Sequence, residues 1–437
     1  MGARRINGLI AMLHRPWSGL ARATPDDRRP LAPGSLLTTR SLVAGAIAAL
    51  LAALDVVVTV VRDGGSGFAN DFYIYWASAH VLTAGGNPYD IGAVNQTLQA
   101  LHLQVTVGQD GYSYPLLFAV LLIPLLSLPP QAAALVFFAL SLAALALTVG
   151  LLLAPMSRYR LWELLLLAVI AGGFVPVRGS LYFGQANLLV LLPLAFAYRG
   201  VAAAVCLPLA ACVKLYPAAG LGLFLCQGRR GVPRLLAGGA LTLALVLLPN
   251  VLLGHQHAGG KLAQMLGPDT FWSNESLNGA ISRLALPSDH TTPLLPGLPV
   301  VPVVLAVTLV TAAIVVVFVW QARGRPWDGC LTLVLGWALL AAPKVSLWDL
   351  APLVLAGAFC WPRVRRRPLR LLVIAAGWTL IALQSSVDLH RHEIYQGSPW
   401  RGLLSSLGVL GTLCVVGMVA YLVHTERPAG RYRVAQD

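Results

Sequence analysis

The chain has 437 residues, of which 57% are hydrophobic and only 11% are charged, and its mean hydropathy is +0.73. A soluble protein carries about a quarter charged residues, so this composition argues against a soluble enzyme. The net charge of +14 comes almost entirely from arginines in short loops and near both ends, which is typical of membrane proteins with basic cytoplasmic loops. The expected partner is therefore a lipid bilayer and not nucleic acid.

Apolar segments of the kind that crosses a bilayer core of roughly 30 Å recur along the chain. They lack the alternating pattern of a membrane barrel, so the sequence predicts an all-α, polytopic integral membrane protein. The candidate segments are 41–62, 116–128, 131–154, 161–177, 187–198, 201–213, 215–226, 235–253, 299–320, 329–342, 350–361, 370–385 and 402–423. Proline interrupts helices, so the segments beside 129–130 and 214–217 are the ones expected to be broken or re-entrant.

Both ends of the chain are basic, which predicts cytoplasmic tails at 1–40 and 424–437 around a membrane domain at 41–423. Two cytoplasmic ends require an even number of crossings, and we expect about twelve. The arginine-rich loops then leave the two long loops, 63–115 and 254–298, on the extracytoplasmic side. The absence of an evident internal repeat argues against a transporter built from inverted halves.

The first long loop begins with the segment FANDFYIYWASAHVL, in which Asp71 precedes a predicted interfacial helix. Phe72, Tyr75, Trp76 and Ala79 share one face of that helix by their spacing. Asp71 is either the N-cap of the helix or a general base that accepts a proton from a hydroxyl substrate. From the local sequence alone, the cap is the favoured interpretation.

Three charged residues lie within or beside apolar sequence. Asp55 is inside the first predicted helix, where a charge costs roughly 2.5 to 3.5 kcal/mol, so it is expected to face the bundle and make a structural hydrogen bond. Lys214 and Lys344 are flanked by apolar residues and proline. Each either binds a phosphate at a broken helix or extends to the membrane interface.

Two polar segments carry side chains suited to a sugar. Gln185 and Asn187 follow a glycine at the start of an apolar segment. The second segment, in the predicted outward loop, contributes Trp272, Asn274, Glu275, Asn278 and Arg283. Stacking, amide and carboxylate groups bind polyhydroxy ligands, although an ordinary solvated loop is the favoured interpretation for any single residue of the second segment.

Motifs for metals, cofactors and nucleotides are weak or missing. His390, His392 and Glu393 form an HxH pattern without further ligands, and an ordinary loop is the favoured interpretation. The cysteines form no CxxC pair, and the phosphate loop, GxSxG and HExxH motifs are absent. We therefore expect no metal and no cofactor.

The order of several blocks carries a family resemblance. They are NDFYIYWASAHVLTAGGNPYD, YSYPLLFAVLLIPLLSLPPQAA, GQANLLVLLPLA, CVKLYPAAGLGLFL, SLNGAISRL and PKVSLWDLAPLVLAG, and they cover most of residues 68–357. This ordered set resembles glycosyltransferase family 87, integral-membrane enzymes of the GT-C superfamily. Two positions depart from the family pattern: Tyr114 is followed by a single proline instead of two, and Trp348-Asp349 stands where many members carry histidines.

The resemblance implies an inverting glycosyltransferase of the plasma membrane, with its active site on the extracytoplasmic side. Its donor would be a polyprenyl-phosphate sugar, mannose being favoured over arabinofuranose, and its acceptor a cell-envelope glycan or glycolipid. It also implies that Asp71 is the general base. Lys214, Arg283 and Lys344 are then candidates for the donor phosphate. Tyr75, Tyr89, Tyr114, Gln185, Asn187, Asn274, Asn278 and Asp349 complete the candidate substrate-binding residues. A transporter or flippase of a lipid-linked saccharide is the alternative from another functional class.

Overall fold

The computed structural model describes residues 36–65, 67–103, 105, 111–253, 267–288, 292–321, 326–389 and 399–425. Within these ranges the regular secondary structure is helical, apart from an isolated antiparallel bridge between Asn274 and Ser346, which confirms the all-α prediction. Most of the predicted tails 1–40 and 424–437, and part of the loop 254–298, lie outside the described residues.

The predicted apolar segments correspond to helices. In chain order the elements are α2 (Thr39–Arg62), α3 (Asn70–Thr83), α4 (Ile91–Ala100), α5 (Leu116–Leu122), η1 (Ile123–Ser127), α6 (Pro130–Leu153), η2 (Ala154–Met156), α7 (Leu161–Gly173), α8 (Val175–Tyr182), α9 (Asn187–Tyr198), α10 (Ala203–Ala211), η3 (Tyr216–Arg230), α11 (Val232–Leu252), α13 (Leu277–Ala285), α14 (Val300–Gln321), α15 (Trp327–Ala341), η4 (Leu347–Leu353), α16 (Val354–Val364), α17 (Pro368–Leu389), η5 (Pro399–Ser406) and α19 (Leu407–Thr425).

Six helices of the described chain, α2, α6, α11, α14, α17 and α19, are long and apolar enough to cross a membrane. Helices α7 and α8 add a seventh span if the pair, bent by 49°, is counted as one. The protein is thus a multi-pass membrane protein, but this criterion does not reach the predicted count of about twelve. Several predicted segments form helices that are too short, among them α9 with 12 residues and α10 with 9 residues.

The bend between α7 and α8 is at Phe174, just before Pro176, and so lies away from both places where a broken span was expected. Pro129 is the N-cap and Pro130 the first residue of α6, a position that proline tolerates because it needs no helical N–H. The segment before them, 116–128, forms α5 and η1 and is too short to count as a span, in line with the expectation. The segment 214–217 does interrupt the helices there, since α10 ends at Ala211 and η3 begins at Tyr216.

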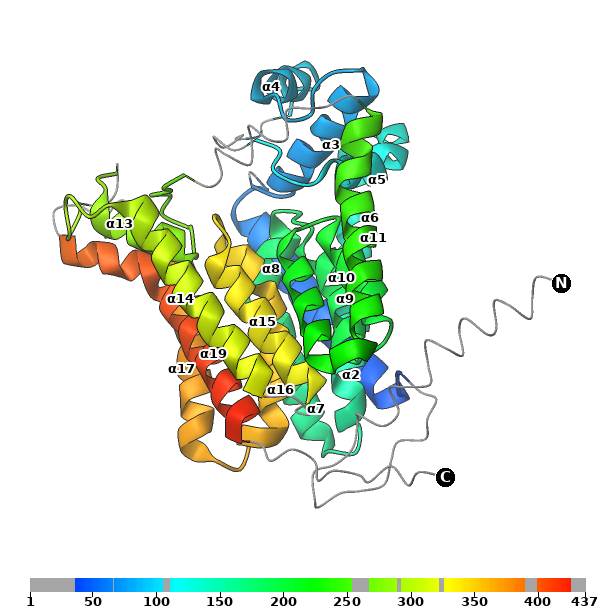
Figure 1. Ribbon diagram of the computed structural model, residues 1–437. Helices are drawn as coiled ribbons and strands as arrows, with labels where there is room; N and C mark the ends of the chain where they lie inside the picture. The colour runs from blue at the N-terminus through cyan, green and yellow to red at the C-terminus, as the bar shows by residue number, and fades with distance from the viewer. Residues whose placement is uncertain are drawn as a thin grey trace.

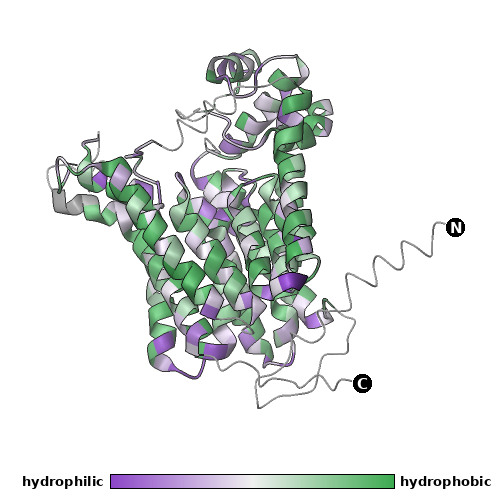
Figure 2. Ribbon diagram, in the orientation of Figure 1, coloured by the Kyte–Doolittle hydropathy of each residue, from purple (hydrophilic) through white to green (hydrophobic). Residues whose placement is uncertain are grey.

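The helices pack on one another through small residues and expose apolar faces to lipid. Figure 2 shows hydrophobic residues along the middle of the bundle and hydrophilic ones toward both ends. At the contact between α2 and α6, a Cβ built on Gly45 lies 2.1 Å from the Ala146 carbonyl oxygen, so only glycine allows this approach. Close backbone contact at small residues is the usual way that membrane helices associate.

Two ends of the bundle are distinct in Figure 1. Helices α3, α4, α5 and α13 lie at one end, and the arginine-containing turn between α16 and α17 lies at the other. The two predicted outward loops therefore share one end of the molecule, as the predicted topology requires. The assignment of that end to the extracytoplasmic side stays a prediction.

The charged residue in the first helix has a partner. Asp55 on α2 accepts a 2.5 Å hydrogen bond from Arg178 on α8, and the two side chains form an ion pair. The expectation that Asp55 faces the bundle and pairs is confirmed. This pair joins the first span to the helix that leads directly to the candidate site.

Candidate active site

The start of α3 positions Asp71. The chain enters the helix through Ala69, which has the left-handed φ of 57° and is the N-cap, while Asp71 is the second helical residue. The Ala69 N–H donates to the Tyr182 carbonyl at 2.8 Å, and the Asp71 N–H donates to the Phe183 carbonyl at 2.9 Å. The predicted N-cap role of Asp71 is therefore wrong, because main-chain carbonyls of the α8–α9 turn satisfy the helix start and leave the Asp71 side chain available.

A glycine makes this contact between α3 and the α8–α9 turn possible. Gly184 has a φ of +69°, and a Cβ built on it lies 2.7 Å from the Cβ of Phe72. Both the backbone conformation and the lack of space require glycine here. The same turn then delivers Gln185 to the side of Asp71.

Asp71 is held by two side-chain amides. Gln185 Nε2 donates to Asp71 Oδ2 at 2.6 Å, and Asn70 Nδ2 donates to Oδ1 at 3.3 Å. Burial raises the pKa of Asp71 above its usual value, although both hydrogen bonds and the positive charge of Lys214 oppose the shift. A raised pKa makes the ionised carboxylate a better proton acceptor.

A lysine–aspartate pair lies beside this carboxylate. Lys214, in the break between α10 and η3, forms an ion pair with Asp349 on η4, and the two side chains are only 13% and 16% exposed. The Ser346 N–H donates to the second Asp349 oxygen at 2.8 Å. Lys214 Nζ also lies 5.1 Å from the ring centroid of Tyr114.

Tyrosines line the same region. Tyr75 and Tyr114 are joined by a 2.7 Å hydrogen bond between their hydroxyls, and their ring centroids are 4.6 Å apart. The Tyr89 hydroxyl donates to the Tyr114 carbonyl at 3.1 Å. The face of α3 that was predicted to lie at the membrane interface is buried in protein, since Tyr75 is 4% exposed and Phe72 is fully buried against Phe137.

The structure also places two residues here that the sequence analysis missed. Tyr112 is 1% exposed and packs 5.5 Å from the Tyr89 ring, and the Tyr216 hydroxyl is buried without a hydrogen-bond partner among the described residues. Both lie inside blocks that were quoted for the resemblance. Their aromatic type was the available signal, but apolar packing explains such residues equally well.

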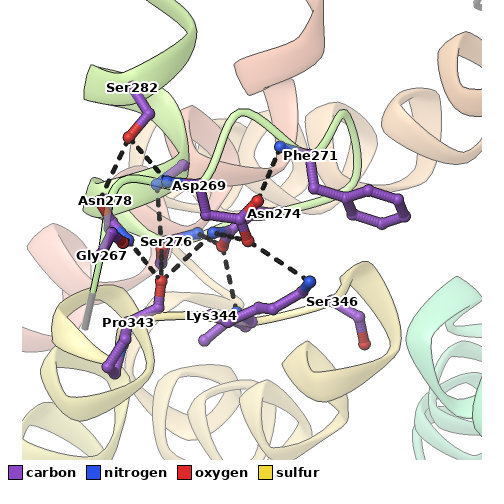
Figure 3. A network of polar contacts seen from close by, with 12 residues as sticks. Gly267, Asp269, Phe271, Asn274, Ser276, Asn278, Ser282, Pro343, Lys344 and Ser346 are labelled. Carbon is purple, nitrogen blue, oxygen red and sulfur yellow. Dashed lines mark hydrogen bonds and ion pairs between the residues drawn. The ribbon is translucent and has the colours of Figure 1, made fainter. Parts of the chain in front are cut away.

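A second set of predicted residues lies on the loop before α13, shown in Figure 3. Asn274, Ser276 and Asn278 donate to the Pro343 carbonyl at 3.3, 3.3 and 3.0 Å. Lys344 Nζ lies 3.5 Å from Asp269 Oδ2. These contacts join the loop to the turn that follows α15.

Arg283 closes this loop from the other side. Its guanidinium donates to the Phe271 and Asn274 carbonyls at 2.8 and 2.9 Å and to the Ser405 carbonyl at 2.8 Å. The residue is only 3% exposed. The observed contacts of Arg283 thus hold the loop against η5, and its predicted contact with a donor phosphate remains a prediction.

The segment 343–349 connects the two sets. Asn187 Nδ2 donates to the Trp348 carbonyl at 2.9 Å, while the Glu275 N–H donates to the Val345 carbonyl at 2.6 Å. The structure therefore brings Asp71, Tyr75, Tyr89, Tyr114, Gln185, Asn187, Lys214 and Asp349 into one contiguous site. It places Asn274 on the adjoining loop, Asn278 and Arg283 on α13, and Lys344 in the connecting segment itself.

The model of glycosyltransferase family 87 matches residues 112–343, which is more than half of the chain. The chain belongs to this family. No curated protein and no solved structure matches it. Family membership makes the protein a membrane glycosyltransferase and decides against the flippase alternative.

The family match covers only part of the site of this glycosyltransferase. Tyr114, Gln185 and Lys214 lie inside the matched residues, whereas Asp71 precedes them and Asp349 follows them. The functional assignment of the two carboxylates therefore depends on their geometry. The HxH pattern at His390, His392 and Glu393 lies outside the described residues.

Glu275 of the glycosyltransferase is a buried carboxyl group on the loop before α13. The residue is fully buried, and a Cβ built on Gly408 at the start of α19 lies 2.4 Å from its Oε2. Burial raises its pKa from 4.5 to about 8, with Arg283 opposing the shift and Asp388 adding to it. The folded protein thus holds a proton here that the unfolded chain releases at neutral pH.

This proton predicts a pH-dependent stability. Because the folded pKa of Glu275 is raised, the free energy of unfolding is expected to fall as pH rises from 4.5 to about 8, by at most about 1.4 kcal/mol per pH unit. Glu275→Gln should remove this slope and raise the melting temperature above that of the wild type at pH 8. Thermal unfolding in detergent between about pH 5 and pH 8.5 measures both effects. Parallel curves for the two proteins would contradict the prediction.

Proposed function

We propose that this enzyme transfers a sugar, with inversion, from a polyprenyl-phosphate-linked donor to a hydroxyl group of a cell-envelope glycan or glycolipid. The observation that carries the proposal is the arrangement of Asp71 beside the Lys214–Asp349 pair. A carboxylate and a cation together are what such a reaction requires. Mannose is the favoured sugar, which makes the enzyme a hexosyltransferase, and arabinofuranose is the alternative.

Asp71 and Lys214 have different roles in the proposed reaction. Asp71 accepts the proton of the acceptor hydroxyl as its oxygen attacks the anomeric carbon of the donor. The bond from that carbon to the phosphate oxygen breaks, and its electron pair stays on polyprenyl phosphate, which gains one negative charge. Lys214 stabilises this charge, with Lys344 as a second candidate. Holding donor and acceptor in line between the two groups supplies much of the remaining rate enhancement.

The other site residues have proposed roles that follow from their contacts. Tyr75, Tyr89 and Tyr114 present rings and hydroxyls suited to a sugar. Asn274, Asn278 and Arg283 hold the loop before α13 against its neighbours and shape the site from outside. In this proposal the loop bounds the site, and substrate contacts come from the tyrosine and lysine side chains.

The proposed placement in the membrane follows the charge distribution. The GT-C domain spans residues 41–423 in the plasma membrane with about twelve crossings, some of them by the shorter apolar helices α9 and α15. The end that carries α3 and α13 faces outward, and the donor phosphate lies at that interface. Helices α11 and α14 are long, apolar and little buried in the protein, which suits contact with lipid.

The test is a donor panel. Purified enzyme in lipid nanodiscs is incubated with acceptor glycolipids and radiolabelled polyprenyl-phosphate mannose, polyprenyl-phosphate arabinofuranose or GDP-mannose. We expect label in the acceptor from a polyprenyl-phosphate donor, with polyprenyl phosphate released in equal amount and the anomeric configuration inverted. Transfer from the nucleotide sugar alone would overturn the proposal.

A further inference from the structure

We propose that Gln185 and Asn187 are positioning residues that orient the Asp71 carboxylate and set its proton affinity. This inference rests on the proposed function, because it assumes that Asp71 is the base. From the sequence, both amides were expected to bind substrate. The hydrogen bonds of the structure give them a different role.

Both polar atoms of the Gln185 side-chain amide make hydrogen bonds. Its Nε2 donates to Asp71 Oδ2 at 2.6 Å, and its Oε1 accepts from Asn187 Nδ2 at 2.7 Å. The residue is 7% exposed, so its groups face protein and not solvent. Rotating the amide by half a turn would set its oxygen against the carboxylate and its nitrogen against the Asn187 nitrogen, and both contacts would be repulsive. One orientation is therefore imposed on Gln185 by its two partners.

Asn187 is itself locked by the main chain. Its Nδ2 faces three acceptors: the Gln185 oxygen, Ser180 Oγ at 3.0 Å and the Trp348 carbonyl at 2.9 Å. The residue is fully buried, and Ser180 Oγ also donates to the Trp348 carbonyl at 3.1 Å. A main-chain carbonyl cannot change its polarity, so it determines the Asn187 orientation, then that of Gln185, and finally the acceptor role of Asp71 Oδ2.

This series of hydrogen bonds makes the two carboxylate oxygens of Asp71 different. Oδ2 takes the short bond from Gln185, while Oδ1 has the longer 3.3 Å contact with Asn70. We assign Oδ1 as the atom that receives the acceptor proton, since displacing the longer contact costs less. The hydrogen bond to Oδ2 favours the ionised form and so limits the rise in pKa that burial causes.

The same series of hydrogen bonds connects the proposed base, Asp71, to Lys214, the proposed ligand of the donor phosphate. Its anchor, the Trp348 carbonyl, is one residue before Asp349, which pairs with Lys214. The acceptor hydroxyl and the donor phosphate would thus contact Asp71 and Lys214, and the positions of both side chains depend on the main chain at 348–349. A shift of that segment would move the base and the cation together.

The experiment is the pH dependence of kcat/KM with polyprenyl-phosphate donor for Gln185→Leu, Gln185→Met and Asn187→Leu. On the acidic side of the pH profile, kcat/KM falls as Asp71 becomes protonated, and this decrease is called the acidic limb. Loss of a hydrogen bond to the charged carboxylate is expected to move the acidic limb to higher pH by about one to two units in the Gln185 variants. Asn187→Leu should shift it in the same direction by less, because Gln185 can then rotate. At pH values above the shifted limb, activity should recover to within about tenfold of the wild type.

A matched control lies outside the site. Gln384 is fully buried and donates to Asp388 at 2.6 Å, so it makes the same amide–carboxylate bond as Gln185. Gln384→Leu should leave the acidic limb in place. Melting temperatures in detergent confirm that each variant is folded, and Gln185→Met keeps side-chain length if Gln185→Leu fails to fold.

The outcomes separate the two proposals. A uniform loss of rate with an unshifted limb, or a change in KM alone, would overturn the positioning role and indicate structure or substrate contact. Asp71→Asn is assayed in parallel. If it is inactive while the limb stays unshifted in the Gln185 variants, only this inference fails; if it is active, the base assignment itself fails.

Discussion

Asp71→Asn is expected to abolish sugar transfer while the protein remains folded. Asparagine has the same shape but cannot accept the acceptor proton, and loss of a general base costs typically 10²- to 10⁴-fold in rate. The fold should tolerate the change, since main-chain bonds to Tyr182 and Phe183 begin α3 and the remaining side-chain oxygen can still accept from Gln185. Initial rates with polyprenyl-phosphate mannose and melting temperatures in detergent measure the two parts.

Asp90 provides the control for Asp71. It is an acidic residue of the same predicted outward loop, and its side chain caps α4 by accepting from the Gly92 N–H at 2.8 Å. Asp90→Asn should keep near-wild-type transfer, because asparagine caps helices about as well as aspartate. Full activity in Asp71→Asn would remove Asp71 from the role of base.

Lys214→Met is expected to reduce kcat/KM for the donor by at least about 100-fold, because the leaving phosphate loses its cation. The same change leaves Asp349 as a largely buried charge without this partner, which costs a few kcal/mol of stability. Initial rates measured against donor concentration and against acceptor concentration give kcat/KM for each substrate. The larger decrease is expected in kcat/KM for the donor. Melting temperature measures the loss of stability.

The double variant Lys214→Met/Asp349→Asn distinguishes a phosphate ligand from a mere counter-ion. Removing both charges restores electrical neutrality, so the melting temperature is expected to return toward that of the wild type. Donor use should stay impaired, because the phosphate still has no cation. Recovery of donor kinetics in the double variant would show that Lys214 only neutralises Asp349.

Much of the helical architecture is predictable from the sequence. The apolar segment 41–62 becomes α2, and 299–320 becomes α14, because long apolar runs in a membrane must satisfy their own backbone hydrogen bonds as helices. Asp55 was expected to pair with another residue of the bundle, because an unpaired charge is costly in the apolar membrane. The number of full spans was not predictable in this way, since α9 and α10 are mostly apolar but have only 12 and 9 residues.

The candidate site is only partly predictable. Resemblance of ordered blocks identified Asp71, but the local pattern favoured an N-cap, because acidic residues are common just before helices. The side chain is available only because Ala69 takes the cap position and the α8–α9 turn supplies carbonyls to the helix start. No pattern around Asp71 contains that information.

By itself, then, the sequence determined that this is an all-α membrane protein and which few polar residues interrupt its apolar segments. The tertiary structure decided which of them meet: Gln185 reaches Asp71 across 114 positions of the chain, and Lys214 reaches Asp349 across 135. Helix formation depends on local hydrophobicity and backbone hydrogen bonding, which a short window of sequence records. The orientation of an amide or the pairing of a charge depends on atoms brought together by packing, and these belong to segments far apart in the chain.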